Sequence, residues 1–137
     1  MASGQMLTVE YMMFFAIGIA LVIITFFIFS NANDSYKKAT LTQQFDKLAE
    51  GIRIISIQVY ETAKWTNSTI TYYYQIPTRL SGSYYEISGE GSPYFNIEST
   101  DKFIVRGYKY IIPFNGHVLS TAEVLKITSS GNDVTIW

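Results

Sequence analysis

The chain of 137 residues contains no cysteine, one histidine and only three prolines. The absence of cysteine excludes disulfides, thiolate metal sites and a cysteine nucleophile. The single histidine, His117, supports neither a two-histidine metal site nor a Ser-His-Asp triad, and we expect it in an exposed loop beside the Asn115-Gly116 turn signal. The net charge is −1, so the basic surface typical of nucleic-acid binding is missing and no nucleic-acid partner is predicted.

Other candidates for chemistry are few. Four acidic residues within the expected strands and loops are compatible with a Ca²⁺ cluster or with a solvated face, and their spacing, which matches no calcium loop, favours the solvated face. These residues are Glu86, Glu90, Glu98 and Asp101. Gly89-Glu90-Gly91 precedes no helix that would cradle a phosphate. The sequence therefore predicts a protein that is not an enzyme, with no cofactor and no metal.

Charge is also missing from one long stretch. Residues 11–29 form an uncharged apolar run, which follows Glu10 directly and precedes a polar stretch that contains Lys37 and Lys38. A helix of this length spans about 28 Å, close to the hydrocarbon thickness of a bilayer. A cleaved secretory signal is the alternative, with the small polar residues 30–35 as its cleavage region. Because residues 1–10 contain no Lys or Arg and the run is too long, we favour a retained transmembrane helix.

The orientation of this helix rests on opposing signals. Lys37 and Lys38 follow the span, which by the positive-inside rule favours a cytoplasmic C-terminal part. Asn33-Asp34-Ser35 and Asn67-Ser68-Thr69 are glycosylation sequons, which require an external location. Long domains translocate largely regardless of charge, so these signals leave the orientation open. The prediction of an external C-terminal domain comes mainly from the family resemblance described below.

A second, amphipathic stretch covers residues 37–64. Its apolar residues follow helical steps of three and four: Leu41, Phe45, Leu48, Ile52, Ile55 and Val59. The opposite side is polar: Gln44, Lys47, Glu50, Arg53, Gln58 and Glu61. Residues 33–35 either cap a new helix or lie within one continuous helix. We expect the apolar stripe to pack on the chain's own sheet, with a coiled-coil partner helix as the alternative.

After Trp65 the pattern is that of β-strands. β-Branched and aromatic runs alternate with Gly, Pro, Asn and Ser, and a hairpin is expected at Asn115-Gly116. The expected strands are residues 69–76, 84–88, 94–98, 102–106, 108–113, 122–128 and 133–137, with 102–106 and 108–113 paired around Gly107. The fold prediction is α+β: a long N-terminal hydrophobic helix followed by a small antiparallel β-sandwich-like domain.

The residues before the apolar run carry the most specific motif. Gly4-Gln5-Met6-Leu7-Thr8-Val9-Glu10-Tyr11 resembles the class III signal peptide of archaeal type IV pilin-like proteins. The order of the later elements, an amphipathic stretch and then strands, is also similar to that family. The resemblance implies a type IV pilin-like fold, with a prepilin peptidase that cuts ahead of the helix. It also implies a pilus assembly platform that packs the retained helix into a filament.

Two features depart from the family pattern. Residues 1–3, Met-Ala-Ser, supply no basic residue before Gly4, and Gln5 and Glu10 are five positions apart instead of four. Cleavage after Gly4 would place Glu10 at mature position six, and cleavage after Gln5 would place it at position five. Glu10 either marks the end of the span at the headgroup level or pairs with the free amino terminus of a neighbouring subunit.

These expectations divide the chain into a processing region (1–10), a long helix (11–64) and a β-domain (65–137). The helix has a membrane or filament-core part (11–29) and an amphipathic part (37–64). The predicted function is that of a major or minor pilin in a homo-oligomeric, adhesive or motile filament, which is held in the membrane before assembly and is extracellular afterwards. Gly18 and Ala20 would allow close approach of helices. The alternatives are a membrane-anchored, archaellum stator-like or envelope-binding protein, and a membrane-tethered enzyme or solute-binding domain.

Overall fold

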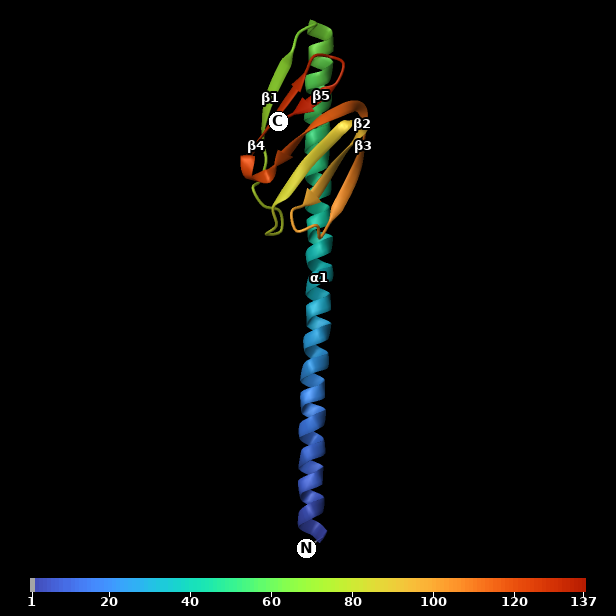
Figure 1. Cartoon of the computed structure of the whole chain (residues 1–137), viewed down its shortest axis with the longest axis vertical. Coiled ribbons are helices and arrows are strands. Elements are labelled where there is room, and N and C mark those ends of the chain that lie inside the picture. Colours follow the sequence, from blue (N-terminus) through green and yellow to red (C-terminus); the bar gives the residue numbers. More distant parts are fainter. Residues whose placement is uncertain (1) are drawn as a thin grey trace. The chain divides into compact units, whose positions relative to one another are not determined.

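The computed structural model describes residues 2–137 and confirms the α+β order of a long helix followed by an antiparallel sheet (Figure 1). The elements are α1 (Ala2–Thr66), β1 (Ile70–Gln75), β2 (Tyr85–Ser99), β3 (Val105–Leu119), the short 3₁₀ helix η1 (Ser120–Ala122), β4 (Val124–Ser129) and β5 (Val134–Ile136). The chain forms two compact units, of which the first ends at Lys37 and the second begins at Lys38. The two units are described separately below.

Helix α1 begins earlier and ends later than the predicted span of 11–64, and it continues through residues 33–35 without a new cap. No proline lies within it, and the hydroxyl of Thr25 bonds inside the helix: Thr25 Oγ1 donates to the Leu21 carbonyl at 2.7 Å. The helix stops where Asn67 adopts a left-handed conformation (φ 48°) and the Ser68 N–H donates to the Ala63 carbonyl at 3.2 Å. This is a common way for a helix to end.

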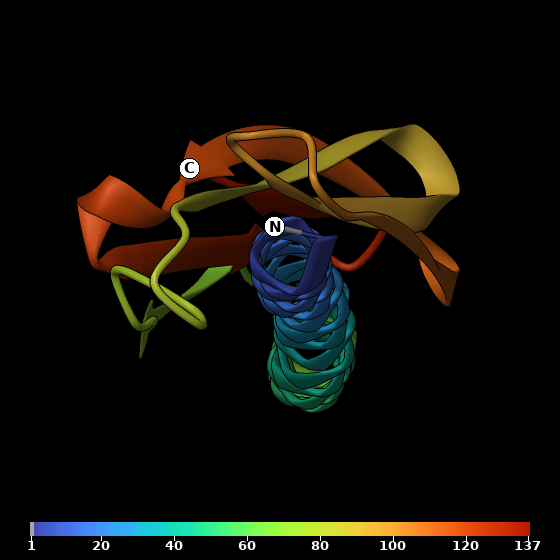
Figure 2. The ribbon, with the colours of Figure 1, turned by 90° about the horizontal axis from the view of Figure 1, so that it is seen from below.

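The five strands form one sheet in the order β1-β4-β5-β3-β2. The pairs β1–β4, β4–β5 and β2–β3 are antiparallel, whereas β3 and β5 run parallel over residues 114–116 of β3. Part 38–66 of helix α1 lies against one side of this sheet (Figure 2). The helix is therefore the layer that covers the apolar face of the sheet.

The strand boundaries predicted between residues 84 and 113 were wrong. Residues 84–88 and 94–98 belong to the single 15-residue strand β2, and residues on both sides of Gly107 belong to β3. β2 and β3 pair with each other, and the register shifts between Glu90 and Ser92 and again between Ser92 and Tyr94. Gly91 and Pro93 lie at these two shifts, so they mark irregularities within the long edge strand β2 and not turns between strands.

The predicted hairpin at Asn115-Gly116 is also absent, because both residues lie inside β3. Gly116 has φ +116°, and a Cβ atom at this position would lie 2.1 Å from the carbonyl oxygen of Ile136 on β5. A residue without a side chain is needed where β3 and β5 approach each other this closely. His117 is consequently a strand residue and not a loop residue, although its side chain is exposed as expected.

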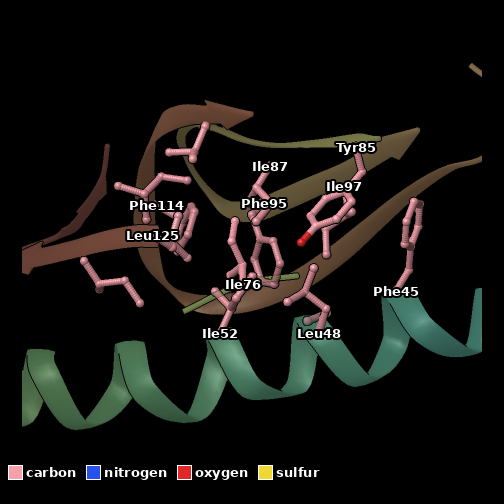
Figure 3. Packing of buried hydrophobic residues seen from close by; sticks show 14 of the residues in the cluster. Phe45, Leu48, Ile52, Ile76, Tyr85, Ile87, Phe95, Ile97, Phe114 and Leu125 are labelled. Carbon is pink, nitrogen blue, oxygen red and sulfur yellow. The ribbon is translucent and has the colours of Figure 1, made fainter. Parts of the chain in front are cut away.

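The core of the second unit lies between the helix and the sheet. The predicted apolar stripe is confirmed: Leu41, Phe45, Leu48, Ile52 and Val59 are buried, and Ile55 is half-buried. These side chains meet Tyr85, Ile87, Phe95, Ile97, Phe114 and Leu125 from the sheet (Figure 3). Because the sheet covers the stripe, the stripe is not free to form the alternative coiled coil. Aromatic rings fill the centre, with the Phe95 and Phe114 centroids 5.0 Å apart.

Candidate membrane and assembly helix

The first unit consists of the helical residues up to Lys37. Every side chain described from residue 3 to residue 36 is exposed, including Phe14, Ile23 and Phe29. By length and composition, this helix is able to cross a membrane. Leaving a large apolar side chain in water costs about 1.5–3 kcal/mol, so residues 11–29 require lipid or other apolar helices around them. The exposed apolar helix is compatible with membrane association.

The four predicted processing and assembly residues all lie in the N-terminal part of α1. Gly4 accepts a hydrogen bond at its carbonyl from Thr8 Oγ1 at 2.9 Å, and Gln5 follows in the same turn. Tyr11 is exposed, as is Glu10. Among residues 2–137, no cation forms an ion pair with the Glu10 carboxylate. Processing at Gly4 or Gln5 stays a prediction, and a partner for Glu10 must come from outside the described residues of the chain.

One side of the apolar helix is indented at Gly18. A shallow apolar depression there is lined by Phe14, Phe15, Ile19, Val22 and Ile23. No atom lies within 4 Å of the position that a Cβ would occupy on Gly18. A small residue between bulky neighbours lets a second helix backbone approach closely, as in packed membrane helices.

The structure separates the two predicted glycosylation candidates. Asn33 lies in the middle of α1, where its backbone is helical. Asn67 is exposed, has a left-handed backbone (φ 48°) and lies in the turn that follows the helix. A glycosylating enzyme would therefore meet Asn67 in an exposed turn and Asn33 on the exposed surface of a continuous helix.

The candidate residues of the β-domain do not form a single site. Glu86 Oε2 lies 3.1 Å from Nε2 of His117, on the neighbouring strand. Asp101 is engaged locally, because its Oδ1 accepts a hydrogen bond from the Phe103 N–H at 3.1 Å. Across residues 2–137, no three His, Asp or Glu side chains gather closely enough to hold a metal ion. The four predicted acidic residues, Glu86, Glu90, Glu98 and Asp101, therefore do not gather into such a cluster.

A polar link that the sequence did not indicate joins the helix to strand β3. Oδ1 of Asp46 accepts hydrogen bonds from the Tyr108 hydroxyl at 2.8 Å and from Nη2 of Arg106 at 3.3 Å. Burial, followed by the hydrogen bond to Asp46, raises the pKa of Tyr108 to about 12. The hydrogen bond with Tyr108 and the charge of Asp46 raise the pKa of Arg106. Beside this link is an open cleft, whose lining includes Ala49, Arg53, Gly107 and Lys109.

No protein-family model, curated protein or solved structure matches the chain. Function is therefore inferred from the residues and from their placement. The motif at Gly4 to Tyr11 and the exposed apolar helix behind it are the two features that bear on function most directly.

Proposed function

We propose that this chain is a structural subunit, major or minor, of an archaeal type IV pilus-like extracellular filament. The observation that carries the proposal is the uniformly exposed apolar run of α1 that starts directly after Glu10, behind a motif that resembles a class III signal peptide. A subunit of this kind needs an apolar helix that its own domain leaves uncovered. The second unit buries its own core with residues from position 41 onward, so residues 11–29 are available for assembly.

In the proposed mechanism, the bilayer holds residues 11–29 of the new chain until assembly. Equivalent helices from other copies then replace lipid around this segment. Lipid and leucine are equally apolar, so close packing and not the hydrophobic effect drives this exchange. The indentation at Gly18 provides a place where a neighbouring helix packs closely.

In a packed assembly, the carboxylate of Glu10 would need a cation beside it. A carboxylate surrounded by apolar helices costs several kcal/mol unless a cation compensates it. No residue of the described chain does so. The free amino terminus of a processed neighbour would supply that cation and would also set the stagger of one subunit against the next.

The proposal is tested by the mature N-terminus and by one matched pair of variants. Intact mass of the native protein should show loss of residues up to Gly4 or Gln5, and sheared extracellular filaments should contain the chain. Glu10→Gln should abolish filaments while the membrane level of the protein stays normal. Glu61→Gln, which changes an exposed glutamate of the second unit, should leave filaments intact. Normal filaments from Glu10→Gln would show that the pairing role is wrong.

A membrane-anchored, stator-like or envelope-binding protein is the second candidate. It is favoured by the spacing of five positions from Gln5 to Glu10, which departs from the pilin pattern of four. Such a protein would keep its full N-terminus and its helix in lipid. An intact mass that includes residues 1–5, with no chain in the filament fraction, would support this candidate against the pilin.

A further inference from the structure

The face of the sheet that points away from the helix carries an ordered set of side chains on β1, β4 and β5. Part 38–66 of helix α1 lies on the opposite side of the sheet, where Leu125, Ile127 and Ile136 are buried (Figure 2). Side chains alternate along a strand, so the neighbours of these buried residues project outward. The outward set on the three strands forms two adjacent rows.

The first row is aromatic and cationic: Tyr73, Lys126 and Trp137. Tyr73 is directly opposite Lys126 in the β1–β4 register. Lys126 and Trp137 exchange two backbone hydrogen bonds, of 3.3 and 3.1 Å, which continue the β4–β5 ladder. Nζ of Lys126 lies 6.0 Å from the centroid of the Trp137 ring. Tyr73 and Trp137 are 65% and 66% exposed, so both rings are available to a ligand.

The second row consists of hydroxyl groups. Thr71 is opposite Thr128, and Thr128 is opposite Thr135. The Oγ1 atoms of Thr71 and Thr128 are 3.2 Å apart and hydrogen-bonded, which shows that they share one face. Each threonine has a hydroxyl that both donates and accepts. Together the two rows contain one charged side chain, that of Lys126, whose ammonium group forms no ion pair with a carboxylate among residues 2–137.

We propose that this face, the Tyr73–Lys126–Trp137 platform with its threonine row, binds an acidic polysaccharide built from uronic-acid units. The two aromatic residues are separated by two strand spacings, about 10 Å, a span comparable to that of a disaccharide. Their rings suit the C–H faces of sugar units, and the threonines suit sugar hydroxyls. Lys126, between the rings, complements a carboxylate of the bound chain.

The same features disfavour other ligands. A single-stranded nucleic acid also stacks on aromatic rings, but it requires several cations that follow its backbone, and Lys126 is the one cationic side chain of the two rows. A neutral polysaccharide would form no ion pair with the ammonium group of Lys126. The inference concerns the second unit alone, and it holds whether or not the chain polymerises.

The test uses the full chain in lipid nanodiscs and measures binding of polygalacturonate oligomers by titration calorimetry. The comparison probes are the carboxyl-reduced form of the same oligomers and a single-stranded oligothymidylate. We expect Tyr73→Ala and Trp137→Ala each to weaken binding of polygalacturonate at least tenfold. Lys126→Gln should weaken it severalfold and should remove the preference over the carboxyl-reduced probe.

Matched controls change the same residue types elsewhere. Trp65→Ala removes a tryptophan that is 88% exposed on α1, and Lys47→Gln removes an exposed lysine of the same helix. Both should bind like the wild type, and near-UV circular dichroism should show that every variant is folded. The proposal is overturned if the wild type does not bind polygalacturonate, or if Trp65→Ala weakens binding as much as Trp137→Ala. Equal or tighter binding of the reduced or oligothymidylate probe would overturn it as well.

Discussion

Replacing Ile52 by alanine tests whether the apolar stripe holds helical residues 38–66 against the sheet. Ile52 is fully buried in the core cluster between helix and sheet. Ile54 lies two positions away on the same helix and is 48% exposed. The pair Ile52→Ala and Ile54→Ala therefore makes the same chemical change on the buried and on the solvent side.

The expected magnitudes follow from what each substitution removes. Ile52→Ala deletes three buried carbons, worth about 0.8 kcal/mol each, and leaves a cavity whose cost adds to this loss. Alanine recovers a few tenths of a kcal/mol through its better helix propensity. We expect the free energy of unfolding to fall by about 3 kcal/mol for Ile52→Ala. Because about half of Ile54 is already in water, Ile54→Ala should cost about 1 kcal/mol or less.

The measurement is urea denaturation of a fragment comprising residues 38–137, which corresponds to the second compact unit. With a slope of about 1.5 kcal/mol per molar urea, the midpoint should fall by about 2 M for Ile52→Ala. Similar midpoints for the two variants would refute the assigned packing of the stripe. A fragment without a cooperative transition would refute the independence of the unit.

Three other predictions address different parts of the chain. Gly116→Ala should destabilise the domain at least twice as much as Gly82→Ala in the same denaturation assay. Both glycines have positive φ, but only at Gly116 would a Cβ meet backbone, 2.1 Å from a carbonyl oxygen. Burial raises the pKa values of Tyr108 and Tyr110 to about 12, above the value near 10 expected in the unfolded chain. The native state therefore keeps protons that the unfolded state has released. The contribution of these two tyrosines to stability should be constant below about pH 10, and stability should fall between about pH 10 and 12. Tyr110→Phe should reduce the loss of unfolding free energy between about pH 10 and 12, measured by denaturation at a series of pH values. An unchanged dependence on pH would contradict the raised pKa of Tyr110. Val22→Asp should reduce membrane integration of the span by about 3 kcal/mol in an insertion assay, whereas Val22→Leu should insert like the wild type.

The helical half of the fold could be predicted from the sequence because its signals are local. The uncharged run 11–29 and the three-and-four spacing from Leu41 to Val59 both report on one helix and on the face that it buries. The continuity of α1 past Asn33 could not be predicted, because Asn-Asp-Ser suits a helix cap as well as an exposed helical surface.

The strand boundaries depended on long-range contacts. The pair Asn115-Gly116 is typical of a turn, yet a glycine is needed at position 116 because Ile136 of β5, twenty residues later in the chain, approaches its backbone closely. Likewise, the link of Asp46 to Arg106 joins residues sixty positions apart, and no spacing rule in the sequence connects them. Of the candidate site residues on α1, Tyr11 could be placed on the helix in advance, whereas Gly4, Gln5 and Glu10 were expected ahead of the helix and lie within it. The outward rows of β1, β4 and β5 became visible only once the strand order was known.

The division of the chain at Lys37 and Lys38 also affects how its sequence can change over generations. The buried core draws all its members from position 41 onward, so substitutions before Lys37 leave the composition of that core untouched. The choice of amino acids at residues 11–29 is then limited by hydropathy and by the lipid or protein that surrounds them. The choice at residues 41–63 is limited by the side chains of the sheet that they contact. A lineage could alter the apolar segment, and with it the surroundings that the segment suits, without changing the core of the second unit.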